Sequence, residues 1–185
     1  NSKPEPLTKK GQMLIFWGWN RAAFSNSDIH FKGNGYDFTL KNVVAHDRPS
    51  DFSYHNYFQL DRVTIPQTNQ RFAYFIKDNV AFVLGIDHMK YVMDQDQSVK
   101  FSGNITDPVY AAMVQNGKVD LTNGEFLTFE HTDGLNYINF GLEKYKNIYN
   151  KEKFDIVWSY GGGLGPMFPK SNVKLFGNER SDRFH

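Results

Sequence analysis

Histidines with acidic neighbours are the residues of this chain best suited to chemistry. Four of the six histidines have a carboxylate within two positions. They occur in the segments SDIHF (27–31), AHDRP (45–49), IDHMK (86–90) and FEHTDG (129–134). An imidazole beside carboxylates can bind a divalent cation or act as a general base. These segments are therefore the first places to look for a site.

The spacing of these residues defines two overlapping candidate sites. The candidate catalytic residues are Asp87, His88, Glu130, His131 and Asp133, and the candidate metal ligands for a divalent cation are Asp28, His30 and His131. Adjacent residues of a strand point to opposite faces, so Asp87 and His88 would share one site only across a bulge. The alternative interpretation is that these polar side chains bind water or lipid phosphate at a membrane surface.

Two other motifs carry weaker chemical signals. The segment GGGLG (161–165) lacks the Lys-Ser/Thr and the helix of a phosphate-binding loop. Small residues inside a narrow barrel or in a loop explain it better. Ser25, Ser27 and Ser159 could be hydrolase nucleophiles, but no local signature surrounds them.

The composition excludes several classes of protein. Lys and Arg total 21 against 20 Asp and Glu, a net charge of +1, which disfavours a nucleic-acid binder. The chain has no cysteine, which rules out disulfides and Cys-based zinc sites. No apolar run approaches the roughly 20 residues of a membrane helix. The segment NSKPEPLTKKGQ has no apolar signal-peptide core, so we expect a mature end or a cytosolic start.

Alternation of apolar and polar residues is the dominant structural pattern. In RFAYFIK (71–77), Phe72, Tyr74 and Ile76 share one face, and after the link Asp78–Asn79 the next run does the same. That run places Val80, Phe82, Leu84 and Ile86 on one face and Ala81, Val83, Gly85 and Asp87 on the other. Two alternating runs around a short polar link predict a β-hairpin.

The same period recurs elsewhere in the chain. Strands are predicted for 12–24, 36–41, 135–145 and 154–163. One short helix is predicted within 107–117, where Asp107 could cap and Pro108 could occupy the first turn. The aromatic content of 16%, with 17 Phe and 10 Tyr, is distributed through these alternating segments. Trp17, Trp19, Trp158 and Tyr160 suit an aromatic girdle at a membrane surface, or the core of a soluble β-protein.

The connections between strands are of two kinds. Those around Asp78 and around 149–151 are short and polar, whereas 25–66, 94–124 and everything after Gly163 are long. Membrane barrels alternate short turns with long outer loops. In such a barrel the segments around Asp87, Glu130 and Asp28 would all lie at one outer rim. We therefore expect an all-β, antiparallel up-and-down barrel with long outer loops.

The strand that begins at Val80 changes from apolar to ionisable residues along its length, as a strand that crosses a membrane would. From Val80 to His88 it would extend roughly 27 Å at about 3.4 Å per residue, and rise about 19 Å at a tilt near 45°. Val80 to Ile86 would then span hydrocarbon, while His88 and Lys90 would reach the interface. A lipid-facing Lys costs about 2–4 kcal/mol at mid-bilayer but about 0–1 at the interface. The competing interpretation is a long strand that leaves the core of a soluble barrel or sandwich.

The segments WGWNRAAFSNSDIHFKGNGYDFTL, GIDHMKYVMDQ and FEHTDGLNYINF resemble those of bacterial outer-membrane β-barrel proteins, broadly the small barrels of the outer-membrane protein A and W types. The resemblance is one of pattern and covers most of the chain. Two features depart from it. The final SDRFH is not a closing strand ending in an aromatic, and five or six strands are countable where closure needs at least eight. An incomplete barrel is therefore expected.

These patterns together favour one fold, location and function for the chain. The chain would be a single barrel domain, 1–185, with a flexible segment at 1–11, located in the bacterial outer membrane. Its role would be structural, adhesive or in small-solute passage, porin-like, without an enzymatic activity. The expected partners are membrane lipids, including lipopolysaccharide, and no cofactor is expected beyond a divalent cation. The alternatives are a lipid-modifying hydrolase with an acid/His site at the rim, and a soluble β-barrel that binds an apolar ligand.

Overall fold

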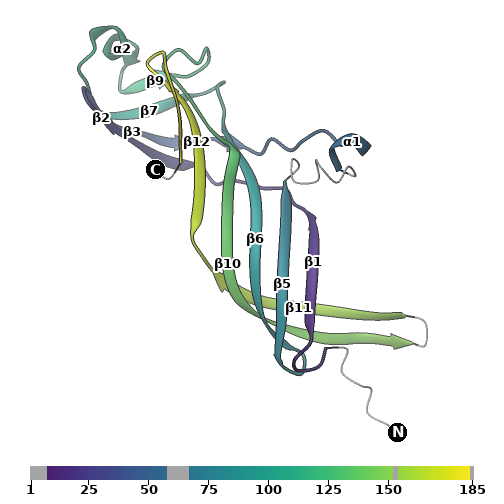
Figure 1. The fold of residues 1–185 in the computed structure, drawn as a ribbon. Coiled ribbons are helices and arrows are strands. Elements are labelled where there is room, and N and C mark those ends of the chain that lie inside the picture. Colours follow the sequence, from purple (N-terminus) through teal and green to yellow (C-terminus); the bar gives the residue numbers. More distant parts are fainter. Residues whose placement is uncertain (1–7, 58–66, 152–153, 184–185) are drawn as a thin grey trace. The chain divides into compact units, whose positions relative to one another are not determined.

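The computed structural model describes residues 8–57, 67–151 and 154–183, and these form antiparallel β-structure with two short helices (Figure 1). The helices are α1 (Tyr54–Tyr57) and α2 (Pro108–Ala112). The strands are β1 (Met13–Trp19), β2 (Ser27–Gly33), β3 (Tyr36–Val43), β4 (Ala45–His46), β5 (Thr68–Lys77), β6 (Val80–Met93), β7 (Ser98–Ile105), β8 (Val114–Gln115), β9 (Lys118–Asp120), β10 (Leu127–Lys151), β11 (Phe154–Leu164), β12 (Met167–Leu175) and β13 (Asn178–Arg183). The expected all-β antiparallel class is confirmed.

The strands belong to two sheets. The eight-stranded sheet has the order β1-β5-β6-β10-β12-β13, with β11 paired to β10 and β4 paired to β6. The five-stranded sheet has the order β2-β3-β7-β9-β8. Neither sheet closes on itself within the described residues, so the structure contains antiparallel sheets and no closed barrel.

The chain divides into two compact units. Unit 1 comprises Asn1–Asn20, Pro66–His88 and Asn136–Met167, and unit 2 comprises Arg21–Ile65, Met89–Leu135 and Phe168–His185. Strands β6 and β10 contribute residues to both units. Unit 1 holds β1, β5 and β11, and unit 2 holds the whole five-stranded sheet.

The predicted hairpin forms the centre of unit 1. β5 and β6 are antiparallel, with Phe72 opposite Leu84 and Tyr74 opposite Phe82, and the link is Asp78–Asn79. Asn79 has a φ of 62°, a left-handed conformation that Asn tolerates well in tight turns. The two faces of this hairpin are the ones that the alternation predicts.

Unit 2 has a conventional apolar core. Its buried members include Phe38, Leu40, Val99, Phe126 and Leu127, with Phe38 and Leu40 at 1% and 0% exposure. On β3 and β7 these residues alternate with exposed polar ones, so one face of the five-stranded sheet is covered and the other meets solvent.

The expectation of long outer loops is wrong for most of the segments concerned. Residues 25–57 contain β2, β3 and β4, residues 94–124 contain β7, β8 and β9, and β12 and β13 follow Gly163. The rest of the first segment, 58–66, lies outside the described residues. These strands form because short alternating runs such as Phe38/Leu40 and Val99/Phe101 pack into a shared core. Their brevity conceals the period in the sequence.

The predicted helix is confirmed in part. Asp107 caps α2 by accepting a hydrogen bond from the Val109 backbone N–H at 2.9 Å, and Pro108 occupies the first turn. The helix ends at Ala112 rather than continuing to 117. Asn116 and Gly117 both have positive φ, 51° and 70°, and connect β8 to β9. An Asn-Gly pair in that conformation favours a two-residue hairpin over helix.

The expected flexible segment, 1–11, is ordered in its last residues. Residues 1–7 lie outside the described ranges. The Thr8 carbonyl accepts a hydrogen bond from the Asn79 N–H at 2.9 Å, and the Gly11 N–H donates to the Phe75 carbonyl at 2.8 Å. Residues 8–11 are therefore bound to the β5–β6 hairpin. Neither helix in the described ranges is long and apolar enough to cross a membrane.

Candidate functional site

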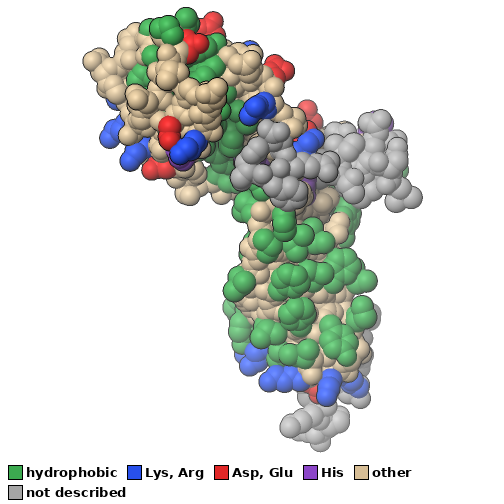
Figure 2. All heavy atoms as spheres, turned by 60° about the vertical axis from the view of Figure 1, so that its left-hand side comes forward, with side chains coloured by type: hydrophobic (Ala, Val, Ile, Leu, Met, Phe, Trp, Pro, Cys, Tyr) green, Lys and Arg blue, Asp and Glu red, His purple; other side chains and the backbone are tan. Residues whose placement is uncertain are grey.

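Large apolar side chains are exposed almost entirely on unit 1. Of the 24 such side chains that are exposed in the described residues, 20 belong to unit 1. Figure 2 shows apolar side chains over its strands, with Lys and Arg gathered at one end. Monomeric soluble proteins rarely expose so large a contiguous apolar surface, and such patches mark interfaces with membranes or proteins.

Strand pairing arranges these side chains in rows on one face. Met13, Tyr74 and Phe82 are opposed across β1, β5 and β6, and so are Ile15, Phe72 and Leu84. The Phe82 and Phe140 rings are stacked with centroids 6.2 Å apart, which continues the face onto β10. We call this surface the apolar band; it comprises Met13, Ile15, Trp17, Phe72, Tyr74, Phe82, Leu84, Phe140, Leu142 and Leu164.

The apolar band ends at a group of lysines and aromatics. Lys144 lies opposite Tyr160 and Lys146 opposite Trp158 on the paired strands β10 and β11. The Tyr145 N–H bonds the Asn79 carbonyl at 2.9 Å, so these pairs lie level with the β5–β6 turn. Aromatic rings and lysines at one level are typical of a membrane–water interface.

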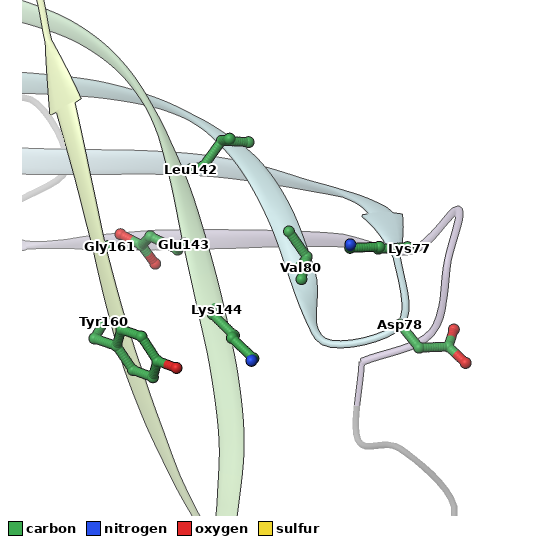
Figure 3. Close-up of a pocket in the computed structure, with 8 residues that line it drawn as sticks. All are labelled: Lys77, Asp78, Val80, Leu142, Glu143, Lys144, Tyr160 and Gly161. Carbon is green, nitrogen blue, oxygen red and sulfur yellow. The ribbon is translucent and has the colours of Figure 1, made fainter.

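An open pocket of about 480 Å³ lies among these lysines (Figure 3). Lys77 and Lys144 line it together with the apolar Val80 and Leu142. The two nearby carboxylates have other partners, because Asp78 accepts from the Lys10 backbone N–H and Glu143 from the Tyr145 hydroxyl. The pocket therefore combines two cations that lack a described acidic partner with an apolar wall, a chemistry that suits an anionic lipid headgroup.

The opposite face of unit 1 is mixed: it carries the apolar Leu14, Phe16 and Phe75 together with a polar network. Arg71 forms a two-pronged ion pair with Asp87, at 2.9 and 3.0 Å, and the Asn139 amide donates to the same carboxylate at 3.2 Å. The Arg71 and Asp87 side chains are only 29% and 13% exposed. Gly85 lies directly opposite Arg71, and a Cβ there would lie 2.5 Å from the Asn139 amide oxygen. Glycine is thus required for this network to fit.

This network was missed by the analysis of the sequence, which assigned Asp87 to a rim site. The sequence contained the information needed. When the hairpin pairs around Asp78–Asn79, the period of two along each strand places Arg71 and Asp87 on the same face. Asn139 could not be identified in this way, because β6 and β10 are joined by no short turn.

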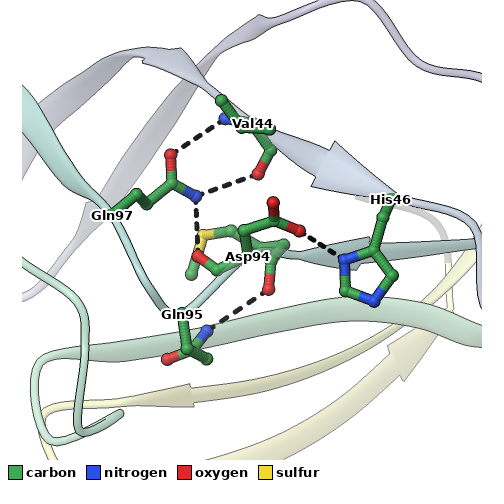
Figure 4. A network of polar contacts seen from close by, with 6 residues as sticks. Val44, His46, Asp94, Gln95 and Gln97 are labelled. Carbon is green, nitrogen blue, oxygen red and sulfur yellow. Dashed lines mark hydrogen bonds and ion pairs between the residues drawn. The ribbon is translucent and has the colours of Figure 1, made fainter.

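The histidines take partners other than their sequence neighbours. His30 contacts Asp37 at 2.8 Å, and His46 contacts Asp94 in a network with Gln97 and Val44 (Figure 4). In that network Gln97 bonds both the N–H and the carbonyl of Val44, at 3.0 and 2.9 Å, which ties the segment before β4 to the end of β6. Asp28 instead accepts from the Asn42 backbone N–H at 2.9 Å. The predicted metal ligands Asp28 and His30 therefore have separate partners in the structure.

The candidate catalytic residues are also held separately. His88 contacts the Asn136 amide oxygen at 2.9 Å and His131 contacts the Ser171 hydroxyl at 3.0 Å. Glu130 pairs with Arg48 at 3.1 Å. In the described ranges, no three His, Asp or Glu side chains are grouped as metal ligands.

Asp133 is held apart from His131 by the alternation of β12. Asp133 accepts from Lys170 at 3.0 Å and Asn172 at 3.2 Å, whereas His131 bonds Ser171 between them. Successive strand residues face opposite ways, so the two groups lie on different faces. The hydrogen bonds from Lys170 and Asn172 hold the pKa of the Asp133 carboxyl below its usual value. A carboxylate that stays ionised and paired suits a structural role better than that of a general base.

Comparisons with protein-family models, with curated proteins and with solved structures found no match for this chain.

Proposed function

We propose that unit 1 inserts into a bacterial outer membrane as part of a transmembrane β-barrel, with the apolar band facing lipid. The observation that carries this proposal is the inverted distribution of side chains in unit 1. The large apolar residues of the apolar band cover one face of its strands, and the Arg71–Asp87–Asn139 network occupies part of the other face. Transmembrane strands alternate in this way, apolar toward lipid and polar toward the interior.

The same distribution argues against a soluble barrel that binds an apolar ligand. Such a protein would place apolar side chains inside and polar ones outside. In unit 1 the buried cluster consists of only Ala73, Phe75, Ala81 and Val83, while Ile15 and Trp158 are 65% and 62% exposed. Burying exposed apolar surface in lipid contributes about 25 cal/mol per Å². The bilayer therefore supplies the burial that the fold of unit 1 does not.

The proposal also requires further strand pairing. Within the described residues β1 pairs only with β5, and β11 only with β10, so unit 1 has two open edges. Unpaired backbone groups are too costly in hydrocarbon for open edges to persist there. In the inserted form both edges are therefore paired with additional strands. The role of this barrel is structural, adhesive or in the passage of small solutes. The lysine-lined pocket, which is level with the short β5–β6 turn, would contact phosphate groups of membrane phospholipids.

The lipid-modifying hydrolase is the weaker candidate. His88 and His131 contact an amide and a hydroxyl, and Asp87, Glu130 and Asp133 are each paired with a cation. No observation on the described residues favours a hydrolytic site over these structural pairs.

Tryptophan fluorescence tests the proposal directly, because all three tryptophans, Trp17, Trp19 and Trp158, belong to unit 1. The full-length protein would be reconstituted into vesicles whose lipids carry bromine on the acyl chains. We expect strong quenching by the brominated lipids and reduced quenching by acrylamide in the buffer. A protein that stays in the aqueous phase, with tryptophans equally open to acrylamide with and without vesicles, would contradict insertion.

A further inference from the structure

The exposed face of the five-stranded sheet in unit 2 is polar and carries a row of lysines. Lys41 on β3 lies opposite Lys100 on β7, and Lys100 lies opposite Lys118 on β9. Opposed residues of paired strands lie on the same face. All three lysines are exposed, and together they form what we call the lysine row.

None of the three lysines forms an ion pair with a carboxylate in the described part of the chain. The same face carries Asp28, Asp37 and Asp120. Asp28 accepts from the Asn42 backbone N–H at 2.9 Å, and Asp37 is bound by His30 at 2.8 Å and by Lys32 at 3.2 Å. Asp120 accepts from the Thr122 backbone N–H at 2.9 Å and from its hydroxyl, and these bonds lower the pKa of its carboxyl. The three acids are thus bound by groups other than the lysine row.

Like charges directly opposite one another destabilise a sheet. Adjacent strands are about 4.7–4.9 Å apart, less than the Debye length of about 8 Å at physiological salt, so screening leaves much of the repulsion in place. The fold does not require lysine here, because the apolar core is built by the other face, through Leu40, Val99 and Val119. A row of charges that the fold does not need is a feature of a binding surface.

The neighbouring side chains indicate what kind of anion fits. Gln115 continues the row on β8, and Thr39 and Ser102 are opposed in the next row. These groups can donate to and accept from sugar hydroxyls. The one aromatic ring in these rows is that of His30, which lies opposite Thr39 and is bound to Asp37, so the rows offer little for base stacking, which disfavours a single-stranded nucleic acid. The net charge of +1 also disfavours nucleic acid.

We propose that this face of unit 2 binds an acidic polysaccharide that lies across β3, β7 and β9. Successive carboxylates of the chain would contact Lys41, Lys100 and Lys118, at an interval of about 5 Å set by the strand spacing. Thr39, Ser102 and Gln115 would hydrogen-bond its hydroxyls. The inference does not rest on membrane insertion, because it involves only unit 2.

The test compares two variants of the full-length protein in detergent. Lys100→Gln removes the central charge of the row, and Lys32→Gln removes a lysine from the same sheet that is already paired with Asp37. Binding of polygalacturonate, neutral dextran and inorganic phosphate would be measured by calorimetry at two salt concentrations. We expect the wild type to bind polygalacturonate in a salt-sensitive manner and not to bind dextran.

Lys100→Gln should weaken that binding about fivefold, as expected for one lysine at an anionic surface. Lys32→Gln should change it less than about twofold, because its ion pair is exposed and weak. The thermal stability of Lys100→Gln should be equal to or above that of the wild type, since repulsion is relieved. Equal losses in both variants, an absence of polygalacturonate binding, or equally tight binding of phosphate would each overturn the proposal.

Discussion

The histidines of the acid/His segments acquire partners other than their sequence neighbours, and His30 contacts Asp37 across the β2–β3 hairpin. His46 contacts Asp94, 48 positions away, and His131 contacts Ser171, 40 positions away. Neighbouring strand residues point to opposite faces, so an acid next to a histidine in sequence is among the residues least able to reach it. Chemistry inferred from adjacency within a strand is for this reason unreliable, while residues two apart, or across a hairpin, are better candidates.

At the residue scale, Asp87→Asn should destabilise the protein. The change leaves the Arg71 guanidinium, 29% exposed, without its carboxylate partner. Breaking a partly buried, charge-assisted contact costs about 1–3 kcal/mol, well above the cost of an exposed pair. Urea unfolding in detergent would measure the loss. The matched control is Asp37→Asn, which breaks the exposed contacts to His30 and Lys32 and should have little effect. Equal stability of the two variants would contradict a structural role for Asp87.

The strands of unit 1 bury few apolar side chains and expose many. β5 alternates between buried Ala73 and Phe75 and exposed Phe72 and Tyr74, which are 38% and 50% exposed. Aromatic residues thus lie on the exposed face as well as on the buried face, whereas the exposed face of a strand in a soluble sandwich is polar. A substitution on this face of β5 should therefore have different effects in water and in lipid.

At the element scale, Phe72→Arg distinguishes the two media. Phe72 lies in the central row of the apolar band, opposite Ile15 and Leu84. An arginine there would be harmless in water but would cost about 2–4 kcal/mol near the middle of a bilayer. We expect greatly reduced assembly into membranes, measured as loss of the heat-modifiable band on gels. Val109→Arg, at a 67% exposed position of α2, is the control and should assemble normally. Normal assembly of both variants would indicate that the band does not face lipid.

At the scale of the whole molecule, the two units bury their apolar residues by different means. Unit 2 encloses a core of Phe38, Leu40, Met93 and Phe126, each 1% exposed or less. Unit 1 has a buried cluster of four residues and an exposed apolar band. One chain thus combines a part with an enclosed apolar core and a part whose large apolar side chains are exposed.

This contrast predicts different accessibility in membranes. The chain has no cysteine, so single cysteines can be introduced without background. Ser102→Cys places a thiol on the exposed face of unit 2, and Tyr74→Cys places one in the apolar band, where the native side chain is 50% exposed. In permeabilised membranes a water-soluble maleimide should label the first and not the second, whereas both should react after denaturation. Rapid labelling of both in the permeabilised membranes before denaturation would indicate that unit 1 is surrounded by water.

The sequence by itself determined the class of the fold and the faces of the individual strands. The alternation around Asp78–Asn79 predicted the β5–β6 hairpin, and the capping pattern at Asp107–Pro108 predicted the start of α2. These are local properties, because side-chain direction along a strand has a period of two and a helix N-terminus needs one capping oxygen. Such features can be read without knowing which strand lies next to which.

Only the tertiary structure decided which side chains from distant parts of the sequence contact each other. The meeting of Arg71, Asp87 and Asn139, the engagement of His131 by Ser171, and the opposition of Lys41, Lys100 and Lys118 all depend on strand order and register. A shift of one residue in register would turn each of these side chains to the other face. The order and register of strands that no short turn connects follow from the packing of whole faces in the folded chain. Parts of the segments expected to be long loops, 25–66 and 94–124, form the five-stranded sheet for the same reason, since each short strand gains stability only from its neighbours.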